Sequence, residues 1–159
     1  MSTRRESREK VIQALYAFEL GGGEGEDIMT TLLKQPLKDD VQSLRFAETL
    51  FLRVLDLTET ADEIIGHHTQ NWELSRIALV DRLILRMAIC EIMTFEDIPP
   101  KVSINEAIEV AKKFSTARSG QFVNGILDAS LEQLRTDGKL NKSGRGLVGT
   151  TLTTDEKDV

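Results

Sequence analysis

Residues 98–128 read IPPKVSINEAIEVAKKFSTARSGQFVNGILD and contain two helical patterns separated by a short polar turn. Before the turn, apolar residues recur at spacings of three and four, which places them on one face of a helix. They are Ile104, Ala107, Ile108 and Ala111. After the turn at residues 115–120, Phe122, Ile126 and Leu127 begin a second apolar stripe. The stretch therefore predicts two successive helices that each bury one face, and it indicates a fold of packed helices.

The first of these helices carries a capping signal at its start. Ser103 and Glu106 match the S-x-x-E capping box, in which the hydroxyl and the carboxylate each accept a hydrogen bond from an otherwise unpaired backbone N–H. The same signal occurs at Thr3 and Glu6, ahead of an apolar stripe that runs to residue 20. We therefore expect one helix to begin near each of these two hydroxyl groups.

Two further helical segments are predicted before the centre of the chain. A short helix over residues 28–34 would be capped by Asp27 and stopped by Pro36. A longer pattern starts near residue 40 and continues toward residue 65, and Thr58 marks a place where it could break.

Residues 74–95 form the most apolar helical pattern and are expected to be the central helix of the core. Charged residues within such a helix must be paired or reach the surface. For Arg86 and Glu91 we expect a structural role, with buried carbonyl groups or each other as partners. Asp81 is compatible either with a structural role or with a surface that faces a protein partner.

Length and composition place the chain among all-α proteins of one domain. It has 159 residues, and its apolar residues are mainly Leu and Ile, with one Trp and one Tyr. From residue 136 onward the periodicity is lost and Gly, Ser, Thr, Asp and Lys predominate. We therefore predict a helical domain over residues 1–135 and a disordered tail over residues 136–159.

The charge of the chain is unevenly distributed. Its net charge of −6 argues against a general nucleic-acid-binding protein, because such proteins are usually basic. The first ten residues nevertheless hold four basic and two acidic side chains, a local charge of +2 that leaves −8 for the rest. Arg4 and Arg8 share a helix face with Arg5 beside them, so this row could straddle phosphates. The alternative is an ordinary solvated helix face.

Catalytic and metal sites are not indicated. Cys90 is the single cysteine and lies in an apolar helical pattern, which favours a buried thiol over a reactive one. His67 and His68 are adjacent and cannot share a helix face, so we expect them on the surface and not on a metal. The glycines at residues 21–25 lack the lysine and hydroxyl of a nucleotide-binding loop. The sequence therefore predicts a binding protein that is not an enzyme and uses no metal or cofactor.

The sequence also favours the cytoplasm. A lone cysteine without a disulfide partner suits a reducing compartment. No apolar run approaches the ~20 residues of a membrane span, and the start of the chain is charged where a signal peptide would be apolar. We expect a soluble cytoplasmic protein.

Single-stranded RNA is a ligand that these features would suit. Unpaired bases stack on aromatic rings and guanidinium planes, and phosphates bind arginines. The arginine row, Tyr16 and Phe122 could provide such a surface if they converge in space. Phe122 is also compatible with a position in the core, which is the commoner outcome for such a residue. Asn124 could either recognise a base edge or cap a helix.

Three blocks of sequence stand out along the chain. The first is RRESRE at residues 4–9 with QALY at residues 13–16, and the second spans residues 81–91, from an Asp-Arg pair through Leu-Arg to Glu. The third is KVSINEAIEVAKKFS at residues 101–115 with FVNGILD at residues 122–128. In order and spacing, these blocks together resemble the NusB family of bacterial transcription antitermination factors.

The resemblance implies an all-helical fold in which two small bundles pack into one compact domain. It also implies non-catalytic binding of boxA RNA from ribosomal RNA operons, together with the ribosomal protein NusE, on the elongating RNA polymerase complex. By resemblance, RNA contacts are expected at Arg4, Arg5, Arg8, Tyr16, Gln121, Phe122 and Asn124. Asp81 falls where an acidic surface would suit a basic ribosomal partner.

Two alternatives remain beside this hypothesis. One is the NusB-like RNA-binding domain that precedes a catalytic domain in some RNA cytosine methyltransferases, although the chain shows no strand-helix pattern for a methyl-donor fold. The other is a homodimer whose interface hides the arginine helix. The main hypothesis requires the chain start and the turn before Phe122 to meet in a single cationic groove that contains aromatic rings.

Overall fold

The computed structural model describes residues 3–69 and 76–148, and within these ranges it contains helices and no strand. In chain order the elements are α1 (Arg4–Glu19), α2 (Gly25–Ile28), the π-helix η1 (Met29–Lys34), α3 (Gln35–Leu37), α4 (Val41–His68), α5 (Leu79–Thr94), α6 (Pro100–Phe114), α7 (Ala117–Thr136) and the 3₁₀ turn η3 (Gly144–Leu147). The all-α prediction is confirmed.

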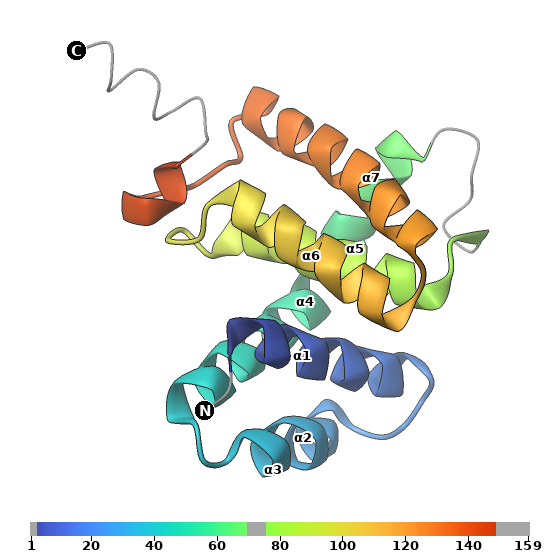
Figure 1. Cartoon of the computed structure of the whole chain (residues 1–159), viewed down its shortest axis with the longest axis vertical. Coiled ribbons are helices and arrows are strands. Elements are labelled where there is room, and N and C mark those ends of the chain that lie inside the picture. The colour runs from blue at the N-terminus through green and yellow to red at the C-terminus, as the bar shows by residue number, and fades with distance from the viewer. Residues whose placement is uncertain (1–2, 70–75, 149–159) are drawn as a thin grey trace.

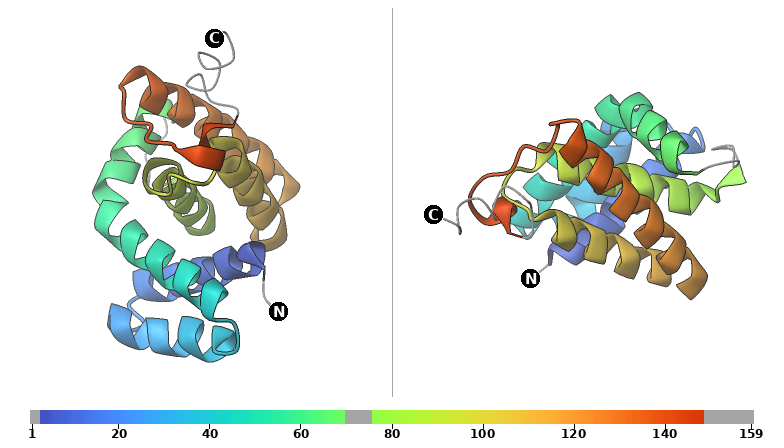
Figure 2. Two further views of the ribbon diagram at one scale, coloured as in Figure 1. Left: turned by 90° about the vertical axis from the view of Figure 1, so that its left-hand side faces the viewer. Right: turned by 90° about the horizontal axis from the view of Figure 1, so that it is seen from above.

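Two helical bundles share the long helix α4. The helices α1, α2 and α3 pack around its first half, and α5, α6 and α7 form the second bundle (Figure 1). Figure 2 shows α4 running from one bundle to the other. Because α5 contacts α1, α4, α6 and α7, it joins the two bundles into one unit. This is the two-bundle arrangement that the resemblance to the NusB family implies.

Helix α1 begins and ends where its local sequence predicts. The Thr3 hydroxyl accepts a hydrogen bond from the backbone N–H of Glu6 at 3.1 Å, which satisfies one of the unpaired donors of the first turn. The helix ends before Gly21, whose φ of 76° is a left-handed conformation that glycine adopts without strain. Val11 and Leu15 bury the inner face of α1.

The segment that follows differs from its prediction. Asp27 lies inside α2 and does not cap a helix, and Pro36 lies in the first turn of α3 and does not stop one. The π-helix η1 closes directly before this proline, with a hydrogen bond from the Gln35 N–H to the Thr30 carbonyl oxygen, so that bond does not need the N–H that proline lacks. The chain therefore remains helical from α2 through η1 to α3, and Leu33 and Leu37 are buried along it.

Helix α4 is continuous. Its N-cap is Asp40, which accepts a hydrogen bond from the Ser43 backbone N–H at 3.1 Å. Thr58 does not break the helix, because its hydroxyl donates to the Val54 carbonyl oxygen at 2.8 Å and so finds a partner within the helix.

Helix α5 is the central helix, as predicted, although it starts at Leu79 and not at residue 74. Eleven of its sixteen residues are buried. Residues 70–75, which include part of the predicted helix, lie outside the described residues. Arg86 and Glu91 have the structural role expected of them, but their partners come from other helices. Arg86 donates to both carboxylate oxygens of Asp62 on α4, at 2.7 and 2.8 Å.

Helix α6 begins at Pro100, three residues before the predicted capping box. The capping prediction for Ser103 and Glu106 was wrong, because both side chains are used in contacts between helices. The Ser103 hydroxyl donates to Glu91 Oε1 at 3.0 Å, and Glu106 binds Arg5. Helix α7 is capped by Thr116, whose hydroxyl accepts from the Ser119 N–H at 3.0 Å.

The chain beyond α7 packs against the second bundle as far as residue 148. Leu140 and Lys142 are buried, and the Ser143 N–H donates to the Glu96 carbonyl oxygen at 3.0 Å. The prediction of disorder was therefore wrong for residues 137–148, because periodicity detects helices and strands but not an irregular segment that docks through a few anchors. Residues 149–159 lie outside the described residues.

Candidate nucleic-acid interface

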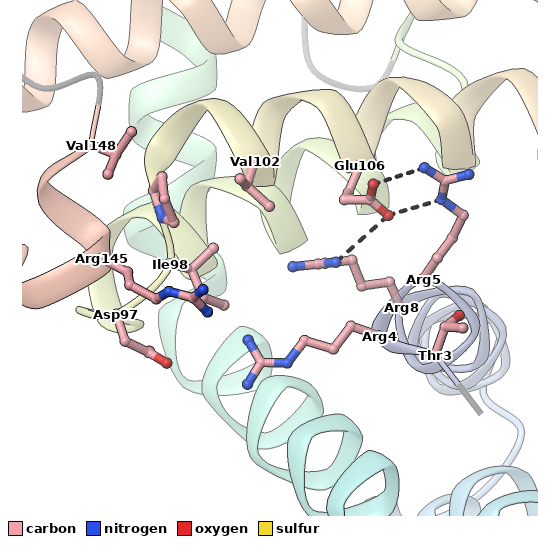
Figure 3. Close-up of a pocket in the computed structure, with 11 residues that line it drawn as sticks. Thr3, Arg4, Arg5, Arg8, Asp97, Ile98, Val102, Glu106, Arg145 and Val148 are labelled. Atoms are coloured by element: carbon pink, nitrogen blue, oxygen red, sulfur yellow. Dashed lines mark hydrogen bonds and ion pairs between the residues drawn. The ribbon is translucent and has the colours of Figure 1, made fainter. Parts of the chain in front are cut away.

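A groove of about 720 Å³ lies where the start of α1 meets the start of α6 and the segment after α7 (Figure 3). Four arginines line this arginine groove, and they are Arg4, Arg5, Arg8 and Arg145. Its other charged lining residues are Asp97 and Glu106. Ile98, Pro99 and Val102 supply apolar surface between them. The groove is therefore a cationic concavity on an otherwise acidic protein.

Arg5 and Glu106 form a two-point ion pair at one wall of the arginine groove. Arg5 Nε and Nη2 donate to the two carboxylate oxygens of Glu106 at 2.9 and 2.8 Å. The hydrogen bonds with Glu106 raise the pKa of Arg5, and the same contact lowers the pKa of Glu106. The Arg5 side chain is still 50 % exposed. An exposed pair of this kind contributes little to stability, so its guanidinium can exchange a carboxylate for a phosphate.

Arg4 carries a charge that no ion pair neutralises within the described part of the chain. Its guanidinium carbon lies 4.7 Å from the centre of the Phe46 ring, close enough for a cation–π contact. The side chain is otherwise exposed. Arg4 is thus held over α4 with its donors available to an anion.

Arg8 is enclosed. Its side chain is 3 % exposed, and its Nε and Nη2 donate to the two carboxylate oxygens of Glu91 at 2.8 and 2.7 Å. A second carboxylate, that of Glu106, lies 3.7 Å from Arg8 Nη1. Of the three arginines in the predicted row, Arg4 and Arg5 therefore reach solvent, and Arg8 forms the base of the groove.

Arg145 is the groove residue that the sequence analysis missed. It is exposed and lies in η3, within the segment predicted to be disordered. Its only local signal is an arginine between two glycines in the sequence SGRGL. Nothing in that pattern connects it with the start of the chain, because the proximity arises from the packing of α1, α6 and the C-terminal segment.

Tyr16 lies farther along the seam between α1 and α6. Its ring is 40 % exposed and borders a shallow pocket of about 270 Å³. The same pocket is lined by Ile12, Gln13, Val80 and Phe114. Between this pocket and the arginine groove, Lys113 on α6 donates to Glu9 on α1 at 2.9 Å. The two helices therefore run side by side from Arg5 toward Tyr16 (Figure 1).

Phe122 and Asp81 line a third pocket, of about 440 Å³, near the start of α7. The Phe122 ring is half-buried and packs against the core, so it has both core and surface character. Asp81 is 7 % exposed and its Oδ2 accepts from the Ser119 hydroxyl at 3.0 Å. The other oxygen, Oδ1, is buried without a hydrogen-bond partner among the described residues. Asp81 thus has a structural contact with Ser119 and also lines a pocket, and its role in binding a protein partner stays a prediction.

Gln121 and Asn124 are exposed on α7, three residues apart and therefore on one face of the helix. Asn124 does not cap α7, which starts seven residues earlier at Ala117. The arginine groove and the Phe122 pocket have no lining residue in common. The expected single groove is therefore replaced by three separate hollows, with Tyr16 in the one beside the seam of α1 and α6.

The geometry does not support nucleophilic or metal chemistry in the described part of the chain. Burial raises the pKa of the Cys90 thiol to about 12, which keeps it protonated at neutral pH. His68 Nε2 lies 2.7 Å from Gln133 Oε1, and Gln133 Nε2 lies 3.2 Å from His67 Nδ1. His67 is exposed as expected, whereas His68 is partly covered. Residues 3–69 and 76–148 hold no cluster of three metal-ligating side chains, and none of their helices could cross a membrane.

Sequence comparison relates most of the chain to one family. A profile of the NusB family matches residues 5–132. The transcription antitermination protein NusB of Salinibacter ruber (strain DSM 13855 / M31) is 52 % identical over 149 residues, which cover 94 % of this chain and 93 % of that protein. The protein of the same name from Chloroherpeton thalassium (strain ATCC 35110 / GB-78) is 41 % identical over 146 residues, 92 % of this chain and 69 % of that one.

Comparison of structures gives the same relationship. The structure of T. maritima NusB has a TM-score of 0.76 and 34 % sequence identity, and the match covers 83 % of this chain and 92 % of that one. A crystal structure of the antitermination factors NusB and NusE in complex with dsRNA matches with a TM-score of 0.74 over 82 % of this chain and 96 % of that one. At 22 % identity, the second match shows a shared fold.

Proposed function

This chain belongs to the NusB family, and on that premise we propose that it is a transcription antitermination factor that binds boxA RNA together with the ribosomal protein NusE. It would act without catalysis, by holding RNA and NusE on the elongating RNA polymerase. The observation that carries the proposal is the arginine groove, in which Arg4 and Arg5 present exposed guanidinium groups on a protein of net charge −6.

The arginine groove suits a phosphate backbone. An arginine binds phosphate through two parallel N–H donors, the same geometry that Arg5 uses with Glu106. The carboxylate of Glu106 holds Arg5 in an extended position before RNA arrives, so less side-chain freedom is lost on binding. Glu106 also repels phosphates that bind in other positions, which favours one register of the backbone.

Arg8 contributes indirectly in this proposal. Its pair with Glu91 is buried and anchors α1 to α5, and Ser103 on α6 donates to the same carboxylate. We assign Arg8 the role of a positioning residue that fixes the first turns of α1. Arg4 and Arg5 make the direct contacts.

The seam between α1 and α6 offers a path for the rest of the RNA. Tyr16 lies twelve residues after Arg4 on α1, a separation of ~18 Å along a helix with a rise of 1.5 Å per residue. Its exposed ring can stack on an unpaired base. Beyond it, Gln121, Phe122 and Asn124 on α7 complete the proposed RNA contacts, with the amides addressing base edges.

The Asp81 side of the Phe122 pocket is the proposed site for NusE, beside the ring that we assign to RNA. One carboxylate oxygen of Asp81 is buried without a hydrogen-bond partner among the described residues, and it would suit a cationic side chain of a basic ribosomal protein. Arg76 and Arg118 line the same pocket, so the incoming cation would have to contact Asp81 directly. The alternative functions lack such support. The methyltransferase domain is not favoured by any feature of the site, and a homodimer that covers the arginine groove would have to bury the uncompensated charge of Arg4.

A titration of labelled boxA RNA, with and without NusE and at several salt concentrations, tests the proposal. The double variant Arg4→Ala/Arg5→Ala should bind at least ~10-fold more weakly at low salt. The slope of log affinity against log salt should fall by ~1.4, since each lost phosphate contact on a single strand accounts for ~0.7. Lys38→Ala, an exposed cation beyond α3, is the matched control and should bind like the wild type. Wild-type affinity of the double variant at low salt would refute the arginine assignment.

A further inference from the structure

The segment between α7 and residue 148 is fixed by an unusual buried lysine. Lys142 is 8 % exposed, and its Nζ donates to the carbonyl oxygen of Phe95 at 2.8 Å and to that of Glu91 at 3.4 Å. These carbonyls lie at the C-terminal end of α5, where the helix dipole favours a cation. Each also accepts a backbone N–H, from Phe95 and from Ile98, so Lys142 adds a second donor to both. Lys142 therefore caps α5 and ties the segment to the central helix.

The backbone on either side of Arg145 is equally constrained. Gly144 adopts a φ of 53°, a left-handed conformation in which a side chain would be strained. A Cβ atom at Gly146 would collide with the carbonyl oxygen of Glu96, so only glycine permits this close approach. Together with the hydrogen bond from the Ser143 N–H to Glu96, these two glycines set the direction in which Arg145 leaves the backbone.

That direction leads into the arginine groove. In Figure 3 the side chains of Arg4 and Arg145 extend toward each other from opposite sides of the groove, with Asp97 beside Arg145. Neither guanidinium takes part in an ion pair with a carboxylate in residues 3–69 or 76–148. Two like charges that face one another repel unless an anion lies between them, and a phosphate can accept hydrogen bonds from both.

We infer that Arg145 is a phosphate-binding residue of this protein and that the segment from residue 142 to residue 148 forms one wall of its RNA site. The inference rests on the proposed function and extends it, because the segment lies beyond residues 5–132, where the family profile matches. Arg4 and Arg5 hold the backbone from α1, and Arg145 holds it from the opposite wall. The RNA then passes between the two walls at the start of its path along α1 and α6.

The test is the boxA RNA titration with the full chain carrying Arg145→Ala, at several salt concentrations. We expect ~5- to 10-fold weaker binding at low salt and a salt slope reduced by ~0.7, the value for one phosphate contact. Arg145→Lys should keep the slope and lose part of the affinity, because lysine retains the charge but not the two-point geometry. Lys139→Ala is the matched control, an exposed cation that precedes this wall and borders a different pocket, and it should leave both values unchanged.

A second variant separates the anchor from the contact. Lys142→Met removes the cap on α5 without touching the groove, and it should weaken RNA binding as Arg145→Ala does, provided that circular dichroism shows the helices intact. Wild-type binding by Arg145→Ala, with a loss in Arg4→Ala/Arg5→Ala, would overturn the inference and leave the proposed function in place. If Arg145→Ala and Arg4→Ala/Arg5→Ala both bound RNA like the wild type, the inference and the proposed function would both be overturned. Tighter RNA binding by Arg145→Ala would also overturn the inference, because Arg145 would then oppose RNA binding.

Discussion

At the scale of single residues, Arg8 and Glu91 show how two charged side chains can be accommodated inside the protein core. Both side chains are almost fully buried, and two hydrogen bonds plus a third from Ser103 satisfy the carboxylate. A buried ion pair contributes little net stability compared with apolar side chains, but loss of one partner leaves an uncompensated charge. The pair therefore acts mainly as a constraint on where α1 sits.

Removal of Glu91 tests that role. Glu91→Ala should lower the free energy of unfolding by ~3–5 kcal/mol, because the Arg8 guanidinium would remain buried without its partner. Urea denaturation followed by circular dichroism measures the change. The double variant Arg8→Met/Glu91→Leu should recover much of the loss, and Glu59→Ala, on an exposed position of α4, should change little. A loss below ~1 kcal/mol for Glu91→Ala would contradict this assignment of the pair.

At the scale of elements, the C-terminal end of α5 is completed by a segment without regular periodicity. Burial lowers the pKa of Lys142 from its ordinary value of 10.5 to about 8. Since the folded state disfavours the charged form, the contribution of this titration to stability is fully present above pH 10.5 and is lost as the pH falls through about 8.

The pH dependence of stability should therefore distinguish Lys142 from its neighbours. The unfolding free energy of the wild type minus that of Lys142→Met should rise between about pH 8 and about pH 10.5, where the unfolded chain binds a proton that the folded chain has lost. Chemical denaturation across this range provides the measurement. Lys139→Met, at an exposed site before Leu140, is the matched comparison. A flat difference for Lys142→Met would show that its ammonium group is not desolvated.

At the scale of the whole molecule, the two proposed binding regions lie at different ends of the seam between α1 and α6. The arginine groove lies at the start of both α1 and α6, and the Phe122 pocket lies at the start of α7. The pocket that contains Tyr16 also includes Phe114, at the end of α6. Separate hollows allow RNA and a protein partner to bind at the same time. A continuous RNA path past both would let each ligand strengthen the binding of the other, by the same factor in both directions.

Asp81→Asn should separate the two ligands. The substitution keeps the shape and a hydrogen-bonding group beside Ser119 but removes the charge, so we expect ~10-fold weaker NusE binding and unchanged binding of RNA alone. Calorimetry with NusE and light scattering with and without RNA measure affinity and oligomeric state together. Glu63→Gln, an exposed charge change on α4, is the control. Equal NusE affinity for wild type and Asp81→Asn would exclude Asp81 from the interface.

The sequence by itself determined the helical class, the cap at Thr3, the end of α1 at Gly21 and the apolar central helix α5. These features depend on neighbours within about one helical turn, so local spacing reveals them. The boundaries predicted at Asp27 and Pro36 were wrong. Packing keeps this segment helical although its local signals predict a helix boundary at each end.

Only the tertiary structure decided which charges are free to bind a ligand. Arg5 pairs with Glu106, 101 positions away, and stays exposed, whereas Arg8 pairs with Glu91, 83 positions away, and is enclosed. Arg145 enters the same groove from a segment without a periodic pattern. The physical reason is that the exposure and partners of a side chain are set by the packing of distant helices, which local sequence does not encode.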